Sequence, residues 1–321
     1  MRPQPNLRAA RTAAAAALAA TGIAAAMPHP AAGAATASPS AVPAVGISLS
    51  DSTLRAGDSV RVAGRTSARQ GGRTIALEFR RAGRGWRTAA VTRVGRDGRF
   101  RFAVRARHSG SLRAVLRAAV ASDGPTAGTA IRSQARGVSV SAAVLRPARD
   151  VGVHHGRRAV LSGVLAPRTP GRAVTLEQHR HGTWSRVARA TTDARGVFRF
   201  RFTPKEVGSW PLRVRFGGDR ANAGTVRRVG RLNSFRSSLA SWYGAYGGAV
   251  ACGGTLGYNE MGVAHKWLPC GTRLTIRYHG RTVQAKVIDR GPYAGGREFD
   301  LSGAVARKLG FGGVGLIEVT R

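Results

Sequence analysis

The chain contains little acid, lysine or cysteine. Among its 321 residues, 15 Asp and Glu stand against 52 Lys and Arg, and only two residues are Cys. Arginine supplies nearly all of the positive charge, because lysine stands only at positions 205, 266, 286 and 308. The net charge of +37 favours polyanionic surroundings such as nucleic acid, anionic lipid or an anionic cell wall. The cations are spread along the whole chain, so they do not predict sequence-specific binding of nucleic acid.

Beyond its N-terminal region, the sequence lacks an apolar run long enough to span a bilayer. Three arginines in the first eleven residues precede the apolar stretch 12–26, and Ala35–Ala37 fits a small-residue cleavage site. This pattern is typical of a secretory signal peptide over residues 1–37. An uncleaved membrane anchor is the alternative. No Cys stands directly after the apolar stretch, so we expect a secreted or cell-wall protein that is not a lipoprotein.

The low cysteine count leaves one pair, Cys252 and Cys270. In an exported protein such a pair indicates a disulfide, which stabilises a fold by roughly 3 kcal/mol for a loop of this modest length. A zinc site is not expected, because no histidine clusters with the cysteines. Four histidines gather elsewhere in the sequence, but no acid or cysteine joins them: they are His154, His155, His179 and His181. We therefore expect no metal and no cofactor.

An internal repeat with a period near 99 residues occupies the middle of the chain. The stretch 62–79 aligns with 161–178, and Trp86 aligns with Trp184. Apolar and polar residues alternate within each copy, which is the period of half-buried strands, and Gly and Asp mark the turns between them. Each copy is therefore predicted to be an immunoglobulin-like β-sandwich. We expect the two tryptophans in its core, with a sugar-binding platform as the alternative.

Composition changes after Arg231, where a short polar segment precedes a Gly-rich region that holds both cysteines. The predicted fold class is all-β, with two sandwich repeats followed by a compact C-terminal domain. The predicted boundaries are a signal peptide 1–37, a linker 38–46, sandwiches 47–140 and 141–231, a linker 232–238 and the last domain 239–321.

Local patterns in the last domain predict several elements. They are strands at 273–278, 282–288 and 315–320, and a helix at 303–310. A turn at His279 and Gly280 joins the first two strands, and Gly310 ends the helix. Either Asp300 or Ser302 is placed to cap the N-terminus of that helix.

Four motifs occur together in this domain. They are SWYG (241–244), AHKWLPCGT (264–272), VIDRGPY (287–293) and REFDLS (297–302). In this order and spacing they resemble the RlpA-like double-psi β-barrel family, in the cysteine-containing form of secreted actinobacterial members. The resemblance covers about a quarter of the chain and implies a six-stranded barrel with a surface groove for a glycan.

The resemblance also implies an activity. Catalytic members are lytic transglycosylases, which cleave the MurNAc–GlcNAc linkage of peptidoglycan and leave 1,6-anhydro-MurNAc. Related barrels bind or loosen wall polysaccharide without this reaction, so the fold alone does not decide the activity. An exported lytic transglycosylase is therefore the first prediction. A non-catalytic wall-binding or expansin-like wall-loosening protein is the alternative.

Breaking a glycosidic bond needs an acid that protonates the leaving oxygen. When the sugar's own 6-hydroxyl is the nucleophile, one carboxyl can act first as acid and then as base. Asp289 matches the catalytic Asp of the family, and His265 matches its active-site His and could hydrogen-bond that carboxyl. Without the resemblance, Asp289 is a turn residue before Gly-Pro and His265 a satisfied core histidine.

Five further residues are predicted to bind the substrate. They are the aromatic Trp267 and Tyr293, the cationic Arg290 and Arg297, and Asp300, which matches the second Asp of the family. The alternatives are salt bridges for the arginines and a helix cap for Asp300. Four other residues are assigned to structure: Trp242 and Tyr243 are predicted to enter the core, and Glu298 and Glu318 to be solvated strand residues.

One position departs from the family pattern. Many catalytic members carry Gly-Glu about eleven residues before the histidine, and here Gly254 stands at that place, with Glu260 as a possible loop substitute. The expected partners are peptidoglycan glycan strands and, through the arginine charge, anionic wall polymers. We expect a monomer without a membrane span in the mature chain.

Overall fold

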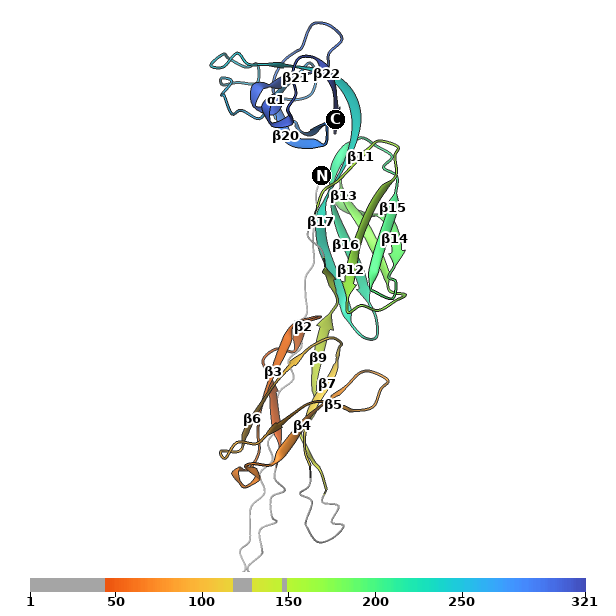
Figure 1. Cartoon of the computed structure of the whole chain (residues 1–321), viewed down its shortest axis with the longest axis vertical. Helices are drawn as coiled ribbons and strands as arrows, with labels where there is room; N and C mark the ends of the chain where they lie inside the picture. The colour runs from red at the N-terminus through yellow and green to blue at the C-terminus, as the bar shows by residue number, and fades with distance from the viewer. Residues whose placement is uncertain (1–43, 118–128, 146–148) are drawn as a thin grey trace, which may run out of the picture. The chain divides into compact units, whose positions relative to one another are not determined.

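A computed structural model describes residues 44–117, 129–145 and 149–321. The predicted signal peptide and most of the predicted linker 38–46 lie outside these ranges. No helix within them is long and apolar enough to cross a membrane. The described chain is built almost entirely of strands, which confirms the all-β prediction (Figure 1).

Two sheets form the first sandwich, one with the strand order β1-β3-β6 and the other with the order β2-β9-β7-β4-β5. Its elements are β1 (Gly46–Leu49), β2 (Thr53–Arg55), β3 (Ser59–Arg65), the 3-10 turn η1 (Ala68–Gln70), β4 (Thr74–Arg80), β5 (Arg87–Arg93), β6 (Arg99–Arg105), β7 (Gly110–Leu116), β8 (Ile131–Arg132) and β9 (Arg136–Ser141). Alternate residues of these strands, including Val62, Leu77 and Phe100, pack into one buried core. This is the predicted immunoglobulin-like architecture.

The second sandwich repeats this plan with sheets β10-β12-β15 and β14-β13-β16-β17-β11. Its strands are β10 (Ala143–Leu145), β11 (Val151–His154), β12 (Ala159–Ala166), β13 (Ala173–Arg180), β14 (Thr183–Thr191), β15 (Val197–Phe202), β16 (Gly208–Gly218) and β17 (Ala223–Tyr243). A register shift between Leu176 and Glu177 repeats the shift between Leu77 and Glu78 in the first copy. The alignment of the two repeats therefore holds at the level of single residues.

The two repeat tryptophans do not lie in the core, contrary to the prediction. Each is half-buried on the outer side of a sheet, where arginine covers its ring. The Arg113 guanidinium lies 4.0 Å from the centre of the Trp86 ring, and that of Arg213 lies 4.2 Å from the Trp184 ring. The rings are thus partly covered by the guanidinium groups and the apolar stems of arginine, although they do not lie in the core.

Strand β17 corrects the prediction of a linker at 232–238. It continues without a break from the second sandwich, where it pairs with β16, into the C-terminal domain. Leu232 and Phe235 are buried, and so are the polar Asn233 and Ser234. The polar residues of this segment suggested that it is solvated. In the structure, however, the side-chain oxygen of Asn233 accepts a 2.6 Å hydrogen bond from the Ser209 hydroxyl.

Six strands close the C-terminal barrel. The order β21-β18-β20-β19-β22-β17 returns to its start because β17 also pairs with β21. The elements not yet bounded are β18 (Gly262–His265), β19 (Arg273–Tyr278), β20 (Arg281–Asp289), β21 (Phe299–Ser302), α1 (Gly303–Leu309) and β22 (Gly315–Val319). Val263, Phe299 and Leu301 lie in its buried core. The predicted six-stranded barrel is confirmed. Its strands β18 to β22 lie toward the blue end of the chain in Figure 1, and β17 enters it in teal.

Helix α1 follows β21 directly and resolves the question of its cap. The Ser302 hydroxyl accepts the hydrogen bond from the Val305 amide, so Ser302 is the N-cap and Asp300 is not. Gly310 ends the helix in the left-handed conformation, with φ at 70°, as its position in the sequence predicts.

A β-bulge shapes the pairing of β18 with β20. Gly262 pairs with Lys286 and Val263 with Val287, but Ala264 then pairs with Asp289, so Ile288 is an extra residue in β20. The Ile288 side chain packs over Gly262. A β-carbon added at Gly262 would lie 2.1 Å from Cδ1 of Ile288 and 2.5 Å from its Cγ1. The bulge therefore depends on glycine at this position.

We predict that Gly262→Ala destabilises the protein by about 1–3 kcal/mol, because the added methyl group overpacks Ile288. Thermal or urea unfolding measures the change. Gly257→Ala is the matched control, since its β-carbon would meet only the Cβ of Glu260, at 4.0 Å. Equal stability of the two variants would contradict the role given to Gly262.

Candidate functional site

The candidate site is built around Ala264, in the middle of three strands. Ala264 on β18 pairs with Asp289 on β20 on one side and with Asp300 on β21 on the other. Directly paired residues point to the same face of a sheet, so both carboxyl groups stand on one face with only a methyl group between them. Two strand spacings separate their α-carbons by roughly 10 Å. Two acids far apart in the sequence thus share one face of the barrel wall.

Asp289 is held in place by the backbone. Its Oδ1 accepts a hydrogen bond of 2.9 Å from the Ala251 amide and one of 2.8 Å from the Arg290 amide. The Ala251 contact comes from the loop that joins β17 to β18. Two amides on one oxygen fix the orientation of the carboxyl group and leave Oδ2 for other contacts. The turn interpretation of Asp289 is therefore correct as local structure, and it is compatible with a place in a site.

Asp300 lies in strand β21, and its partner is a serine on β17. The Ser241 hydroxyl donates a hydrogen bond of 2.7 Å to Oδ1 of Asp300. Burial raises the pKa of Asp300 above its ordinary value, and the charge of Asp289 adds to that rise. The Ser241 hydrogen bond and Arg297 oppose it without cancelling it. Asp300 is thus in surroundings that favour its protonated form.

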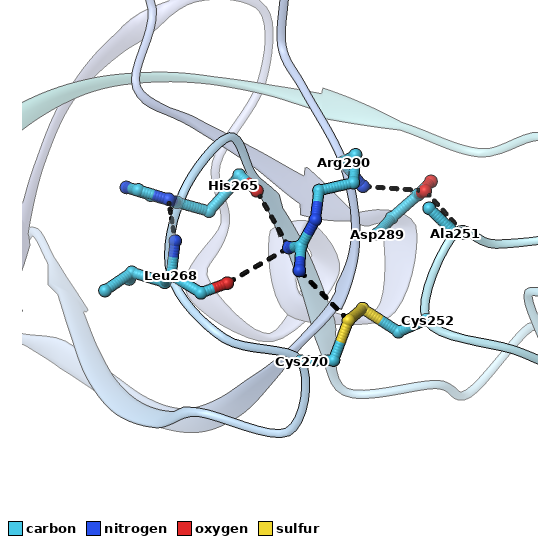
Figure 2. The surroundings of a disulfide bond; sticks show 7 residues. All are labelled: Ala251, Cys252, His265, Leu268, Cys270, Asp289 and Arg290. Carbon is cyan, nitrogen blue, oxygen red and sulfur yellow. Dashed lines mark hydrogen bonds between the residues drawn. A yellow bond between two sulfur atoms is a disulfide. The ribbon is translucent and has the colours of Figure 1, made fainter.

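His265 does not meet Asp289. Side chains alternate along a strand, so the residue after Ala264 points to the opposite face, and His265 pairs with the core residue Phe299. Its ring lies 4.8 Å from the Phe299 ring, and His265 is buried. Figure 2 shows the imidazole turned away from Asp289. The predicted direct pairing of these two residues is absent from the hydrogen bonds of the described chain.

Both ring nitrogens of His265 are occupied. Nδ1 accepts hydrogen bonds of 3.0 Å from the Trp267 amide and 2.9 Å from the Leu268 amide. An acceptor of amide hydrogens carries no proton of its own, so the proton of the neutral ring stands on Nε2. That nitrogen lies 3.3 Å from Oε1 of Glu298 and donates to it. His265 thus fixes the turn at 266–268 and anchors it to the barrel.

Glu298 is not the solvated residue that the sequence suggested. Its carboxylate accepts hydrogen bonds from both terminal nitrogens of Arg236, from the Ser238 hydroxyl at 2.7 Å, and from His265. Burial opposes its charge, but the hydrogen bonds from Arg236 and Ser238 outweigh burial and lower the pKa of Glu298 to about 2.

Glu318 is likewise paired. Its two carboxylate oxygens accept hydrogen bonds of 2.6 and 2.7 Å from Arg277. These hydrogen bonds lower the pKa of Glu318. The prediction of a solvated residue is therefore wrong here as well, because Arg236 pairs with Glu298 and Arg277 pairs with Glu318.

Arg290 braces the loop that carries the disulfide (Figure 2). One terminal nitrogen donates to the carbonyl oxygens of His265 at 3.2 Å and Leu268 at 3.0 Å. The other lies 3.2 Å from Sγ of Cys270. Cys270 is bonded to Cys252, which confirms the predicted disulfide. The guanidinium predicted to bind substrate is therefore engaged in holding the loop after β18 to the end of β20, and the disulfide joins that loop to the one that carries Cys252.

The two aromatic residues predicted to bind the substrate are open to solvent. Trp267 is 84% exposed and Tyr293 is 78% exposed. Arg297 is half-buried, donates to the Ala294 carbonyl at 3.0 Å and acts electrostatically on Asp300. Trp242 is 46% exposed, so the prediction that it enters the core is wrong. Trp267 and Tyr293 are thus exposed side chains of the loops that follow β18 and β20.

Tyr243 belongs to the site face, which the sequence did not predict. It lies two residues after Ser241 on β17, and its ring packs against Val250, Leu256 and Ile288 rather than in the barrel core. Its hydroxyl oxygen is buried and has no hydrogen-bond partner among the described residues. This placement could have been predicted from the sequence, because residues two apart on a strand, such as Ser241 and Tyr243, share a face.

Gly254, which replaces the glutamate of many family members, has φ at 84° and open space where a β-carbon would stand. Glu260 does not replace that acid directly, because its carboxylate forms a 3.2 Å ion pair with Lys286. Within the described ranges, no three His, Cys, Asp or Glu side chains gather in a way that could hold a metal ion.

Comparison with known proteins matches this domain. Residues 236–321 fit the double-psi β-barrel family described as "Lytic transglycolase". The "Probable endolytic peptidoglycan transglycosylase RlpA" of Aquifex aeolicus is 46% identical over 86 residues, which cover 26% of this chain and 38% of that protein. The "Endolytic peptidoglycan transglycosylase RlpA" of Pseudomonas aeruginosa is 43% identical over 84 residues, or 25% of each chain. The chain thus spans well under half the length of these relatives.

Among solved structures, the tetra-tandem repeat in the extending region of a large adhesion protein aligns with 80% of this chain and 65% of its own. The sequence identity is 16% and the TM-score is 0.33.

We predict that Glu298→Gln flattens the acid limb of the stability curve. A carboxyl whose pKa is lowered by folding contributes stability above its unfolded value, near 4.5, and loses it as the pH falls through its folded value, about 2. The wild-type protein should therefore lose stability more steeply than the variant between about pH 4.5 and pH 2. Urea unfolding at several pH values measures this, and parallel curves would contradict the pairing of Glu298 with Arg236 and His265.

Proposed function

We propose that this chain, whose C-terminal domain is an RlpA-like double-psi β-barrel, is an exported lytic transglycosylase of peptidoglycan. The observation that carries the proposal is the placement of Asp289 and Asp300 on either side of Ala264, on one face of the barrel wall. The relatives named above, which are called endolytic peptidoglycan transglycosylases, supply the class of substrate. The proposed reaction cleaves the MurNAc–GlcNAc linkage of a glycan strand.

Asp289 is the proposed general acid and base. In the first half of the reaction its carboxyl gives a proton to the linkage oxygen, and the bond between that oxygen and C1 of MurNAc breaks. The 6-hydroxyl oxygen of the same MurNAc then bonds to C1, and its proton returns to the carboxylate. The product is a 1,6-anhydro-MurNAc end, no water is consumed and the acid is regenerated. One carboxyl suffices for this cycle, which fits a face that is poor in acids.

Asp300 assists as the second carboxyl. Burial and the charge of Asp289 raise the pKa of Asp300, so this pair of acids retains a proton more readily than two separate exposed acids would. Asp300 and Arg297 also lie where they can contact the substrate. Loss of Asp300 should therefore weaken the reaction without removing the acid that is proposed to carry it.

His265 acts on the site through the loop that it holds. Its buried ring fixes the turn before Pro269 and Cys270, while Arg290 and the disulfide join that turn to the loop that donates the Ala251 amide to Asp289. His265 is therefore a positioning residue in this proposal, not a proton carrier. Trp267 and Tyr293 are proposed as platforms for the flanking sugars.

The remainder of the chain serves the same surroundings in this proposal. A secretory signal peptide directs export, and the mature protein acts as a monomer at the cell wall. The two arginine-rich sandwiches serve as spacers and contact anionic wall polymers. That contact should weaken at moderate salt, since exposed charges are screened beyond about 8–10 Å at physiological ionic strength.

A non-catalytic wall-binding or wall-loosening function is the second candidate. Gly254 favours it, because many catalytic relatives have an acid at this place and the open space beside Gly254 contains none. The same face would then bind glycan without cleaving it. Product analysis separates the two candidates.

We predict that Asp289→Asn abolishes cleavage and leaves the fold intact, because the amide keeps a hydrogen-bond acceptor for Ala251 but cannot supply the proton. The measurement is mass spectrometry of products from glycan strands freed of stem peptides. The wild-type protein should produce 1,6-anhydro-MurNAc ends, and the loss in the variant should exceed about 100-fold. Asp51→Asn, an exposed acid of the first sandwich, is the control and should act like the wild type.

Absence of anhydro ends from the wild type, together with binding of both proteins to purified walls, would replace the catalytic proposal with the binding one. Equal cleavage by wild type and Asp289→Asn would remove Asp289 from the mechanism.

A further inference from the structure

The sheet β1-β3-β6 of the first sandwich has an outer face on which arginines gather. Alternate residues of β3 and β6, such as Val62 and Phe100, are buried in the core, and the residues between them point outward. The outward arginines, all exposed, are Arg61, Arg65, Arg99, Arg101 and Arg105. The three strands contain no acid. We call this surface the arginine face.

Strand register places these cations close together. Arg65 stands directly opposite Arg99, and Arg101 stands opposite Ala63, diagonal to both Arg61 and Arg65. Diagonal neighbours on one face of an antiparallel pair lie roughly 7–8 Å apart, and like charges directly opposite each other destabilise a sheet. The face therefore carries a repulsion that a bound polyanion would relieve.

The acids of the protein leave most of this charge in place. Arg99 approaches the carboxylate of Asp97 at 3.5 Å, but both side chains are more than half exposed. No carboxylate of the described chain forms an ion pair with the other four arginines of the face. On the other sheet of the same sandwich, in contrast, Glu78 pairs with Arg113 at 2.7 Å.

The second sandwich does not repeat the cluster. Three positions that are arginine on β3 and β6 are valine on the corresponding strands β12 and β15, where they are Val160, Val164 and Val197. Only Arg199 and Arg201 are exposed there on β15. A general excess of arginine would act on both copies alike, so the arginine face is a property of the first copy.

The shape and the other residues of the face indicate which anion fits it. Two adjoining hollows run along it and share Ser48, Ala63 and Arg101, so small residues lie between the guanidinium groups. The aromatic Phe100 and Phe102 are buried, which leaves no ring on which a base or a sugar could stack. Guanidinium groups bind phosphate oxygens in pairs. The face therefore suits an extended chain whose backbone itself carries phosphate.

We propose that the arginine face is the docking surface for a linear phosphodiester polymer of the cell wall. The polymer lies along the two hollows, with successive phosphates against Arg61, Arg101 and Arg65. This inference makes the wall contact of the proposed function specific, and it rests on that function only for the export of the chain. Polymer binding and glycan cleavage then belong to separate domains of one protein.

Binding of poly(glycerol phosphate) to the full chain tests this inference, with double variants that lose equal charge. Arg61→Gln/Arg101→Gln alters the arginine face, and Arg199→Gln/Arg201→Gln alters the corresponding sheet of the second copy. The first variant should bind roughly tenfold more weakly, for two exposed ionic contacts, and the second should bind like the wild type. Each phosphate contact contributes about 0.7–0.9 to the salt dependence of nucleic-acid binding, so the slope of log Kd against log salt should become shallower by roughly 1–2 in the first variant alone.

The thermal midpoints should equal that of the wild type, because all four side chains are exposed. Arg65→Gln/Arg101→Gln repeats the test on the same face and should show the same loss. Equal weakening by the two matched variants would overturn the proposal, since net charge alone would then account for binding. Tighter wild-type binding to polyglutamate or to single-stranded DNA than to poly(glycerol phosphate) would overturn it as well, because the partner would then be a carboxylate polymer or a nucleic acid.

Cleavage of glycan strands that carry no phosphate polymer separates this proposal from the catalytic one. All of these variants should form 1,6-anhydro-MurNAc ends at the wild-type rate. A wild-type protein that binds poly(glycerol phosphate) without cleaving glycan would support the arginine face and contradict the catalytic function. A wild-type protein that cleaves glycan and does not bind the polymer would overturn the arginine face alone.

Discussion

The pairing of β18 with two neighbours at Ala264 is the constraint on which the site depends. The extra residue Ile288 shifts the register of β20 by one position and places Asp289, rather than Ile288, beside Ala264. Without that shift the alternation of the strand would turn the carboxyl toward the other face. The bulge therefore brings Asp289 onto the face that already carries Asp300.

Arginine pairs with two other acids of the barrel, Glu298 and Glu318. Arg236 and Arg277 bind Glu298 and Glu318, and each pairing lowers the pKa of its acid. Asp300 stands apart because its hydroxyl partner and Arg297 do not offset burial and the charge of Asp289. Arginine is abundant in this chain, so a carboxyl with a raised pKa is one that forms no close ion pair with it. Such a carboxyl is a candidate for a functional site.

The connection between His265 and Asp289 is indirect and mechanical. Glu298 orients the imidazole, the imidazole fixes the turn at 266–268, and Arg290 joins that turn to the disulfide (Figure 2). The disulfide in turn fixes the loop whose Ala251 amide binds Asp289. A substitution at any of these positions is expected to displace Asp289 without touching the substrate.

Strand alternation and repeat spacing are local signals, and they predicted the two sandwiches. The local pattern of 303–310 predicted helix α1, the cysteine pair predicted the disulfide, and the resemblance to a known family implied the barrel. The strand through 232–238 could not be predicted from its polar letters, because the partners that bury Asn233 and Ser234 lie elsewhere in the chain.

At the site, the family resemblance pointed to both Asp289 and Asp300, and the structure pairs both residues with Ala264. The direct pairing of His265 with Asp289 does not occur, because alternation along β18 turns His265 toward the core, whereas the bulge in β20 brings Asp289 to the opposite face. Tyr243 was predicted to enter the core because an aromatic residue in a barrel strand is ordinarily a core residue. Cross-strand register, and not residue type, separates these roles.

Carboxyl NMR of the protein labelled with ¹³C-aspartate tests the central claim most directly, and is practical because Asp and Glu together number only 15. If Asp289 and Asp300 share one face, Asp300 titrates above its ordinary value, and Asp289→Asn lowers the midpoint of Asp300 by removing a neighbouring negative charge. A midpoint of Asp300 that does not move in that variant would contradict the account.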